Sequence, residues 1–591
     1  MSIQLKFDND DLGKVYKEVY TDKMNYLVEV ITKYKTGIDQ FNVLNFEAGL
    51  GKSFTVNRVL QELITECWED KQKFLIVKRF NDDSNKSVDF IHCDYIKDQA
   101  VAITHENWSK WQLNLEELQT MKVIFISHQR YIALCEHDEL RELFSMDRNT
   151  LIIDEKINFP VYAYNDKKYS KIFEVIPNGL RDSLLKVTKP LNEFIELQKT
   201  LKQTNKVISR KFKIHPATLK NFVSDVEVAL ENFTIKEMDK RNVIKSFIKE
   251  LQLFYSSQCL YNGGNISTYN PKHKHWGLNN NIILDASAQI DGAYLCNPEK
   301  YKIINQSRII DHKGCHFNLV KFNSSKSNVI QYSEKYFYEI ACKICENKGD
   351  NDNILVVGHK DFAKKIYGEL IKLDVDEQEI WIDGNGDYNK QSIAISWYGN
   401  LIGKNWASDF TQVWLISTPN IPLEHYLIHF LHYSDDKIGN KSTEVYKGRY
   451  KNGYFNMIQK GYIASEIYQS LKRVQRVAVP EGDFFIACHD EEIIDMVLSQ
   501  IKNVNKVNQI ELDFVKQIKE EKRQKQKLDK KPDQVDKFIE FILNQPKGSY
   551  KKSEISDKLS ITKINRILSD TRVKALLNTH LCIHNRNIER L

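Results

Sequence analysis

The chain has 591 residues, more than one hydrophobic core can organise, so we expect several domains. Hydrophobic residues make up 42% of it and charged residues 28%, the net charge is +6, and no apolar run is long enough to cross a membrane. The N-terminal segment has no apolar stretch of the kind that directs secretion. We therefore expect a cytoplasmic protein with no membrane contact.

The first informative stretch is NFEAGLGKSFTV at residues 45–56, which contains a Gly-Lys-Ser triplet. A phosphate-binding loop usually has glycine six residues before its lysine, where this chain has Phe46. The apolar FNVLNF before the loop predicts a buried strand, and apolar residues at helical spacing follow it, which is the context such a loop requires. A chance triplet is the alternative. The predicted nucleotide contacts are Gly49, Leu50, Gly51, Lys52, Ser53 and Phe54.

Within this loop, the lysine and the serine have separate expected roles. Lys52 would reach the β- and γ-phosphates of a nucleotide, and Ser53 would be a ligand of Mg²⁺. Backbone N–H groups at the start of the following helix would bind the phosphates, helped by the positive end of the helix dipole. The sequence therefore predicts ATP and Mg²⁺ as cofactors.

A pair of carboxylates follows the third apolar stretch after the loop. KFLIV (73–77) and VIFIS (123–127) predict strands, and NTLIIDEKINFP (149–160) predicts another that ends in adjacent acids. Asp154 would hold the metal through water, and Glu155 would polarise the attacking water as a general base. For the pair alone, a strand followed by a helix with an aspartate cap is the alternative. Its position downstream of a Gly-Lys-Ser favours an ATPase.

The interval between the two motifs also contains cysteines and tryptophans. Cys67, Cys93 and Cys135 lie there without a close pair, whereas an iron–sulfur cluster takes four thiolates, so we expect reduced thiols. Trp108 and Trp111 could stack nucleic-acid bases. A helix that half-buries both tryptophans is the alternative.

Later segments extend the pattern, and the order of motifs resembles that of superfamily 2 DNA and RNA helicases. IILDASAQIDG (282–292) resembles their Ser-Ala-Thr motif, and NILVVGHKDFAKKI (353–366) resembles the start of their second motor domain. The segment 398–422 is similar to their motif V, with Gly403 and Asn405 where Gly-x-Asp is common. By this resemblance, Gly403 and Asn405 are further candidates for nucleotide contact.

The sharpest similarity is IYQSLKRVQR at residues 467–476, which keeps the Q-x-x-x-R-x-x-R spacing of the arginine-finger motif. Gln469, Arg473 and Arg476 occupy the motif positions, and Lys472 replaces the frequent glycine. The resemblance implies that the two arginines stabilise charge on the leaving phosphoryl group when the cleft closes. The expected catalytic set is Lys52, Asp154, Glu155, Gln469, Arg473 and Arg476.

The resemblance implies an α/β fold with two tandem RecA-like parallel-sheet domains, at residues 1–320 and 321–495. A lysine-rich insertion of helical periodicity, at about 160–280, is similar in position to the arch of the excision-repair type of helicase, here without an iron–sulfur cluster. Such an arch could guide a single strand. Solvated helices that pack on the motor are the alternative.

A charged linker is expected at 496–533, because residues 516–531 carry eight basic and three acidic side chains and no aromatic. Residues 534–591 predict a winged-helix-like domain, in which KKSEISDKLSITKINRILSD forms a helix, a turn and a second helix. Lys563, Asn565 and Arg566 face outward and are candidates for contact with the major groove of DNA. A protein-docking role for the same domain is the alternative.

The function implied is an ATP-dependent helicase or translocase that hydrolyses ATP on DNA, single-stranded or forked. A second hypothesis is an initiator of DNA replication, or a DNA sensor, whose ATPase only switches conformation. A third hypothesis, an RNA-remodelling helicase, is disfavoured by the winged-helix pattern. An unwinding assay separates the first two, because a switch would hydrolyse ATP without displacing a strand.

Overall fold

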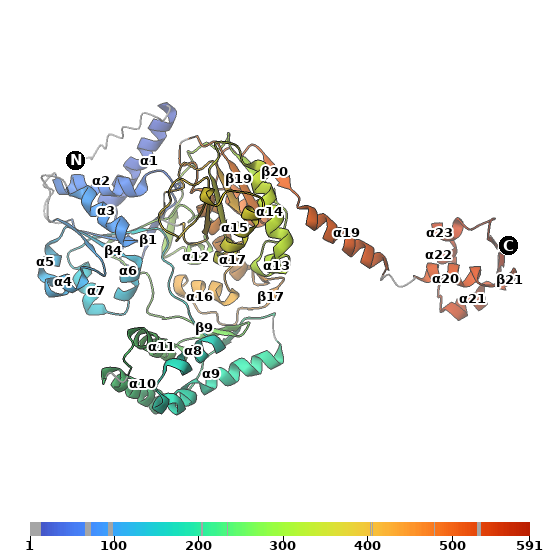
Figure 1. The fold of residues 1–591 in the computed structure, drawn as a ribbon, viewed down its shortest axis with the longest axis horizontal. Helices are drawn as coiled ribbons and strands as arrows, with labels where there is room; N and C mark the ends of the chain where they lie inside the picture. The colour runs from blue at the N-terminus through green and yellow to red at the C-terminus, as the bar shows by residue number, and fades with distance from the viewer. Residues whose placement is uncertain are drawn as a thin grey trace. The chain divides into compact units, whose positions relative to one another are not determined.

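A computed structural model describes residues 14–65, 72–92, 99–202, 205–232, 235–401, 404, 406–477, 479–528 and 533–591. The chain divides into two compact units, Met1–Ile510 and Glu511–Leu591. Figure 1 shows the elements of both.

The first unit contains two seven-stranded parallel sheets, and the first of them has the strand order β11-β1-β10-β5-β2-β4-β3. Every residue of β1, β2 and β10 is buried, as expected for parallel strands with helices on both faces. The strands are β1 Phe41–Leu44, β2 Phe74–Lys78, β3 Ala100–Ile103, β4 Val123–Ser127, β5 Thr150–Asp154, β10 Asn280–Leu284 and β11 Tyr301–Ile304.

The helices around the first sheet include the one that begins at the Gly-Lys-Ser triplet. Its residues Val56, Val59, Leu60, Leu63 and Ile64, which show helical spacing in the sequence, are all buried. The helices are α1 Lys14–Lys33, α2 Lys52–Thr65, α3 Asn81–Ile91, α4 Trp108–Leu113, α5 Leu115–Thr120, α6 His128–Leu134, α7 Asp138–Ser145 and α12 Gly292–Leu295.

The second sheet has the order β14-β15-β13-β16-β19-β12-β20 and is also parallel. Its strands are β12 His316–Val320, β13 Ile354–Gly358, β14 Ile380–Ile382, β15 Ile393–Trp397, β16 Gln412–Leu415, β19 Asp483–Ala487 and β20 Val507–Ile510. Its helices and short hairpin strands are α13 Lys326–Gln331, α14 Ser333–Asn347, α15 Ala363–Lys372, α16 Leu423–Tyr433, β17 Val445–Tyr446, β18 Arg449–Tyr450, α17 Gly453–Leu471 and α18 Glu491–Leu498. The edge strand β20 lies inside the stretch 496–533 that the sequence predicts to be a linker, and the strand β12 lies before the boundary expected at 320.

The interval between β5 and β10 contains more than the helices that its periodicity predicts. Four helices pack with a four-stranded antiparallel sheet of order β6-β9-β8-β7. The β8–β9 hairpin turns at Gly263-Gly264, whose φ angles of +55° and +88° suit glycine. The elements are β6 Tyr162–Tyr164, α8 Asp166–Val175, α9 Arg181–Leu201, β7 Ile208–Arg210, α10 Pro216–Glu231, α11 Met238–Ser256, β8 Cys259–Asn262 and β9 Asn265–Thr268. We call this interval the inserted subdomain.

Helix α16 follows β16 of the second sheet in the sequence, yet it packs against α12, against strands β8 and β9 of the inserted subdomain and, through the rings of Tyr433 and Tyr301, against β11 (Figure 1). Nine of its eleven residues are buried. The carboxylate of Glu424 accepts hydrogen bonds from Asn262 Nδ2 (2.9 Å) and Ser267 Oγ (3.4 Å), on the two strands of the β8–β9 hairpin. Polar contacts therefore fix the start of α16 to the inserted subdomain.

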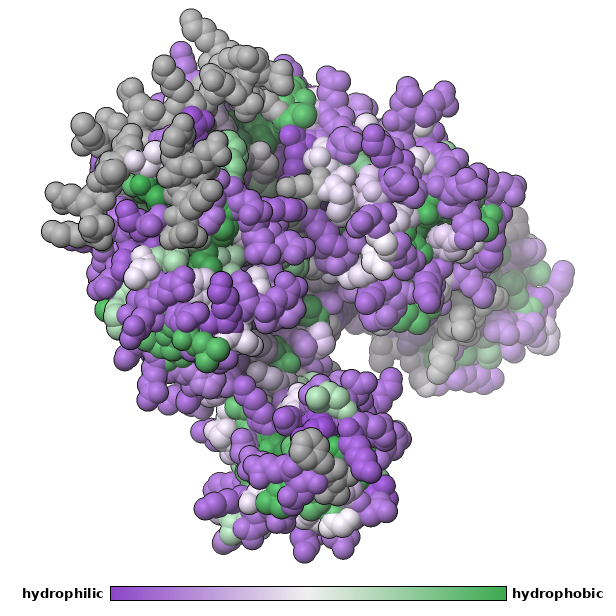
Figure 2. Space-filling view, turned by 60° about the vertical axis from the view of Figure 1, so that its left-hand side comes forward, coloured by the Kyte–Doolittle hydropathy of each residue, from purple (hydrophilic) through white to green (hydrophobic). Residues whose placement is uncertain are grey.

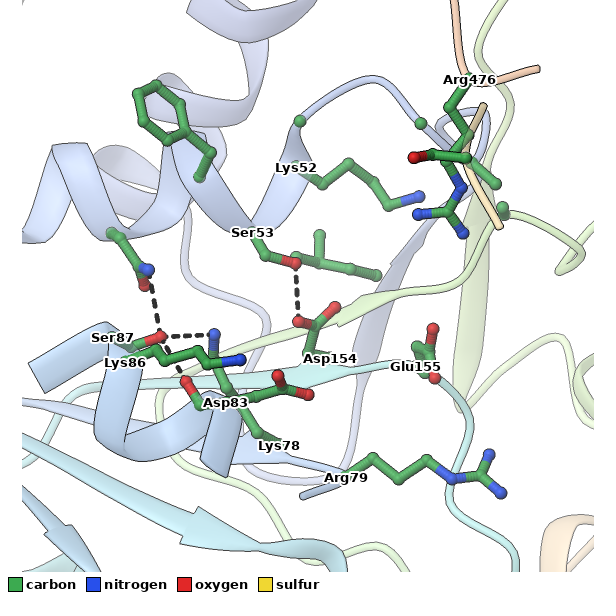
Figure 3. A pocket seen from close by; sticks show the side chains of 18 of the residues that line it. Lys52, Ser53, Lys78, Arg79, Asp83, Lys86, Ser87, Asp154, Glu155 and Arg476 are labelled. Carbon is green, nitrogen blue, oxygen red and sulfur yellow. Dashed lines mark hydrogen bonds between the residues drawn. The ribbon is translucent and has the colours of Figure 1, made fainter. Parts of the chain in front are cut away.

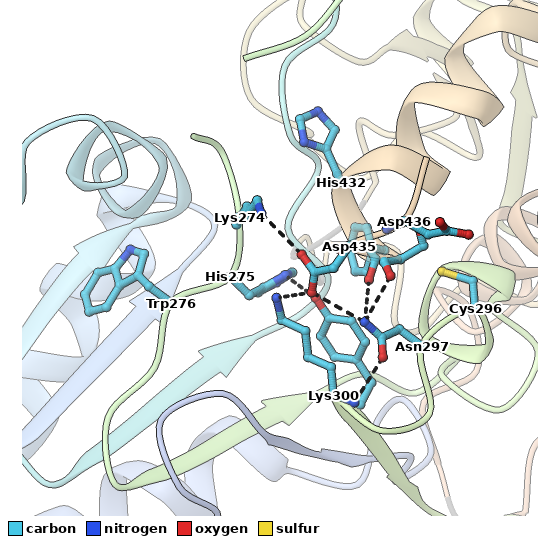
Figure 4. Close-up of polar contacts among 12 residues, drawn as sticks. Lys274, His275, Trp276, Cys296, Asn297, Lys300, His432, Asp435 and Asp436 are labelled. Carbon is cyan, nitrogen blue, oxygen red and sulfur yellow. Dashed lines mark hydrogen bonds and ion pairs between the residues drawn. The ribbon is translucent and has the colours of Figure 1, made fainter. Parts of the chain in front are cut away.

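The other end of α16 is attached to the first sheet. The hydroxyl group of Tyr433 donates to the carbonyl of Ile157 at 2.7 Å, three residues after Asp154. Asp435, just beyond the helix, forms ion pairs with Lys300 (3.0 Å) and Lys274 (3.6 Å), as Figure 4 shows. The segment that follows the carboxylate pair is thus supported by a helix from the second half of the chain.

The second unit, described by itself, starts with helix α19 Asp513–Leu528. Three helices and a helical turn then pack with a three-stranded antiparallel sheet of order β21-β23-β22. A small core that includes Phe538, Ile555, Leu568 and Ile588 joins them. The elements are α20 Gln534–Leu543, β21 Gly548–Lys551, α21 Lys552–Leu559, α22 Ile564–Leu568, α23 Thr571–Lys574, β22 Leu581–Ile583 and β23 Asn587–Arg590.

The face drawn in Figure 2 is mainly hydrophilic, with hydrophobic side chains in small separate patches. Within the described residues, no helix combines the length and the apolar character needed to cross a membrane.

Candidate functional site

The loop between β1 and α2 has the backbone that its glycines predict. Gly49 and Gly51 have φ angles of +91° and +69°, a left-handed conformation that other residues rarely adopt. The loop ends where Lys52 begins helix α2, so the first N–H groups of that helix face the loop. The Lys52 ammonium donates to the carbonyls of Phe46 and Glu47, each at 3.1 Å, and burial lowers its pKa to about 8. A phosphate group would replace these two weak acceptors with a charged one.

The carboxylate pair lies at the carboxyl end of β5, next to the loop. Ser53 Oγ donates to Asp154 Oδ2 at 2.7 Å, so the two expected metal ligands are already in contact. Glu155 has a φ of +71°, an uncommon backbone conformation for this residue type that is often retained at functional sites. Burial raises the pKa of the Glu155 carboxyl, and the nearby Arg473 guanidinium opposes this rise. A raised pKa brings a carboxylate closer to the range useful for a general base.

Side chains from the second half of the chain complete the site. Arg473 Nη2 lies 3.8 Å from Glu155 Oε1 and 3.3 Å from the Gln469 amide oxygen. The Cβ and Cγ atoms of Arg476 lie 3.8 Å from the position a Cβ on Gly49 would take, so this arginine covers the loop. Arg476 is labelled near Lys52 in Figure 3. The segment directly after α17, which carries both arginines, therefore faces the loop and the carboxylates.

One cavity of about 590 Å³ is common to these groups (Figure 3). Its lining includes all six residues of the expected catalytic set, and it includes five of the six expected loop contacts. The Leu50 side chain instead packs into the core with 7% exposed, and Gly403 and Asn405 lie outside the described residues. The lining residues expected from the sequence are Gly49, Gly51, Lys52, Ser53, Phe54, Asp154, Glu155, Gln469, Arg473 and Arg476.

The segment similar to the Ser-Ala-Thr motif links the two halves of the site. Ser287 Oγ donates to Asp285 Oδ1 at 2.7 Å and accepts a hydrogen bond from Ser465 Oγ, also at 2.7 Å. Gln469 Nε2 donates to Ser287 Oγ at 3.3 Å. Because Ser465 and Gln469 lie on α17, these hydrogen bonds connect that helix to the segment after β10. Gln289 accepts a hydrogen bond from Asn45 Nδ2 at 3.2 Å, next to the loop.

The sequence analysis missed one side of the cavity, formed by the end of β2 and by α3. Lys78 is buried and donates to Ser87 Oγ at 2.6 Å, and Ser87 in turn donates to the carbonyl of Asp83 (Figure 3). Arg79 donates to the carbonyl of Gly399, at 2.8 Å, and thus joins the two halves of the first unit. The sequence contained a signal for this side, because a buried strand that ends in Lys-Arg places two cations at the edge of the sheet that bears the Gly-Lys-Ser loop.

The residues fit Mg²⁺ and a nucleoside triphosphate. Mg²⁺ typically takes one or two protein ligands and completes its shell with phosphate and water, which Ser53 and Asp154 permit. Among the described residues, no group of three or more His, Cys, Asp or Glu side chains could hold a metal by itself. Glu155 Oε2 is buried without a hydrogen-bond partner in the described part of the chain, and an attacking water would provide one.

Other predicted residues lie apart from this cavity. Trp111 is buried, and Trp108 is half-buried with the Arg130 guanidinium 4.1 Å from its ring centre, so the alternative to base stacking fits the structure better. Cys135 is a buried thiol whose pKa is raised to about 11 by burial, whereas Cys67 and Cys93 lie outside the described residues. Lys563, Asn565 and Arg566, in the second unit, are exposed.

No protein-family model matches the chain, and no curated protein matches it. Solved structures do have a similar fold. The chain is 13% identical to an apo XPD structure, with a TM-score of 0.53, over 85% of this chain and 100% of that one. It is also 13% identical to S. tokodaii Xpd4, with a TM-score of 0.52, over 83% of this chain and 100% of the other. The chain therefore has an α/β fold with two tandem RecA-like parallel-sheet domains, as the sequence predicts.

Proposed function

We propose that the chain is an ATP-dependent helicase or translocase that acts on DNA. The observation that carries the proposal is the shared cavity, where the phosphate-binding loop and the carboxylates of one sheet meet two arginines of the other half of the chain. Such a cavity changes shape when the two domains move relative to each other. ATP turnover can then be coupled to movement along a bound strand.

We infer that nucleotide binding begins at the loop. Gly49 and Gly51 allow the backbone to approach the phosphates, and the N–H groups at the start of α2 donate to them. Lys52 is expected to leave its two carbonyl acceptors and contact the β- and γ-phosphates. Bound ATP with Mg²⁺ supplies the phosphoanhydride whose hydrolysis releases free energy, and Ser53 and Asp154 would hold the metal.

The remaining catalytic residues are proposed to act on the attacking water and on the developing charge. Glu155 would accept a proton from the water, and its 3.8 Å contact with Arg473 holds the carboxylate in place. Arg473 and Arg476 would stabilise the negative charge of the transition state. Gln469 would connect the two domains in the closed cleft through its hydrogen bond to Ser287. Loop contacts by Leu50, Phe54, Gly403 and Asn405 remain proposals on the basis of their sequence positions.

DNA, single-stranded or forked, is the proposed partner. The second unit has the element order of a winged helix, and its exposed Lys563, Asn565 and Arg566 support contact with a major groove. RNA is the competing substrate, and protein docking is the competing role for this unit. The helical elements of the inserted subdomain are proposed to guide a strand in the manner of an arch.

We place the protein in the cytoplasm, because the described cysteines are all free thiols, which is typical of a reducing compartment. We infer that no iron–sulfur cluster is bound, because such a cluster takes four thiolates and the interval between the loop and the carboxylates contains three cysteines without a close pair.

ATPase activity with and without single-stranded DNA tests the proposal most directly. A translocase should show turnover that rises several-fold with DNA and should displace a labelled strand from a forked duplex. ATP hydrolysis without strand displacement would instead support the second hypothesis, a replication initiator or DNA sensor. Stimulation by RNA alone would redirect the substrate assignment.

A further inference from the structure

Lys472, one residue beyond the end of α17, contacts two other parts of the first unit. Only 6% of it is exposed. Its ammonium lies 3.1 Å from His312 Nε2 and 3.9 Å from Glu47 Oε1. Glu47 belongs to the phosphate-binding loop, and His312 belongs to residues 309–312, which precede the first strand of the second sheet. We call residues 309–312 the connector.

Glu47 joins the loop to the connector. It is 1% exposed, and its Oε2 accepts hydrogen bonds from the backbone N–H groups of Ile309 (2.7 Å) and Ile310 (3.1 Å). Its backbone carbonyl accepts a hydrogen bond from Lys52. The other carboxylate oxygen, Oε1, has no hydrogen-bond partner within the described residues, and its nearest cation is Lys472.

His312 is arranged to receive a cation. Its Nδ1 lies 3.1 Å from the carbonyl of Ile310, which requires the ring proton on Nδ1 and leaves the lone pair of Nε2 for the Lys472 ammonium. Burial, with the adjacent Lys472, lowers the pKa of His312 to about 3, which keeps the ring neutral. The lysine therefore bridges a neutral acceptor on the connector and a carboxylate on the loop.

The bridge depends on the relative position of the two domains. Lys472 and the adjacent Arg473 directly follow α17, whereas Glu47 lies in the loop after β1. When the domains separate, Glu47 keeps its two backbone hydrogen bonds but loses the Lys472 ammonium beside Oε1, and a buried carboxylate that loses its ion-pair partner is costly. Other cations lie nearby, but Lys23 donates to Gln306, and Arg308 donates to the carbonyl of Asn45.

We propose that Lys472 is a positioning residue that ties the arginine-bearing segment after α17 to the phosphate-binding loop and to the connector. The inference rests on the proposed ATPase function and deepens it. Lys472 does not contact the reacting atoms. It fixes the position of Glu47, and thus of the loop, relative to Arg473 and Arg476 when the cleft is closed.

The test compares Lys472→Met with Lys472→Arg, Glu47→Gln and the double variant Lys472→Met/Glu47→Gln, with single-stranded DNA present. Misplacement of catalytic groups by about 1 Å lowers turnover on the order of 10²-fold, so we expect a kcat loss of this size in Lys472→Met. The affinity for a fluorescent ADP analogue should change less than about threefold. Lys472→Arg should recover most of the turnover, and the double variant should lose less than the two single variants combined.

Lys460→Met is the matched control, because Lys460 lies on the same helix and pairs with Glu492 away from the loop. It should retain wild-type turnover. Normal kcat in Lys472→Met, or additive losses in the double variant, would overturn this inference while the ATPase assignment stands. A wild-type protein without ATP turnover would overturn the proposed function, and the inference with it.

Discussion

Replacement of Arg473 by alanine removes a cation from the site, together with its contacts to two neighbouring side chains. The side chain is 5% exposed, and its guanidinium contacts Glu155 at 3.8 Å and Gln469 at 3.3 Å. Loss of an arginine that stabilises transition-state charge lowers kcat by about 10³-fold, which corresponds to about 4 kcal/mol. The affinity for nucleotide should change little, because the contact with the phosphoryl group strengthens only in the transition state.

The same substitution should also change the pH dependence. Burial raises the pKa of Glu155, and Arg473 opposes that rise, so the pKa should increase further in Arg473→Ala. A general base works in its deprotonated form, so turnover falls as the pH drops through this pKa. The acid limb of the kcat profile should therefore move to higher pH in the variant.

Steady-state ATPase measurements between about pH 6 and 9 check both expectations. Circular dichroism and the affinity for a fluorescent ADP analogue control for folding. Because Glu155 retains 26% of its side-chain exposure, we expect a stability loss below the roughly 3–5 kcal/mol seen when a fully buried ion pair is broken. Near-normal kcat in Arg473→Ala, with an unmoved acid limb, would refute the reasoning.

Three more predictions concern the loop lysine and the second unit. Lys52→Ala should abolish ATP hydrolysis and leave the fold intact, which turnover and circular dichroism would check, and normal turnover would contradict the nucleotide site. Since the pKa of Lys52 is about 8, the ligand-free protein loses this cation as the pH rises through 8, so the affinity for ATP should fall there. Equilibrium measurements of ATP binding across that pH range should show the fall in affinity for the wild-type protein and no such fall for Lys52→Met. Removal of residues 534–591 should preserve basal ATPase activity and weaken DNA binding at moderate salt. At that salt concentration, the contacts that the lysines of the charged linker make with phosphates are screened and contribute little to DNA affinity. Equal DNA affinity and sequence preference of the two proteins at moderate salt would leave partner docking as the better role for this unit.

Local patterns in the sequence predict much of the cavity. The glycines, Lys52 and Ser53 lie in a strand–turn–helix segment, and the carboxylates lie at the end of a buried strand. The backbone conformation of each motif can therefore be predicted from its own residues. Parallel strands place their carboxyl ends at one edge of the sheet, which brings motifs 100 residues apart together. The distance between Ser53 and Asp154, 101 positions apart in the sequence, follows from that rule.

Other features depend on contacts that a local pattern cannot specify. Helical periodicity in the insertion hides short strands such as β7 and β9, of three and four residues, whose pairing is set by partners far along the chain. The placement of α16 on the first sheet is equally non-local. Lys472 is visible in the sequence only as a departure from a motif, and its role depends on Glu47 and His312.

The attachment of α16 to the β8–β9 hairpin has a consequence for synthesis of the chain. Glu424 emerges from the ribosome 162 residues after Asn262 and 157 residues after Ser267. At about 5–20 residues per second, the hairpin waits on the order of ten seconds or more for its partner. During that time the surface that α16 later covers is exposed on the nascent chain. Chaperone occupancy on stalled ribosomes should therefore be greatest for nascent chains that end between the hairpin and α16.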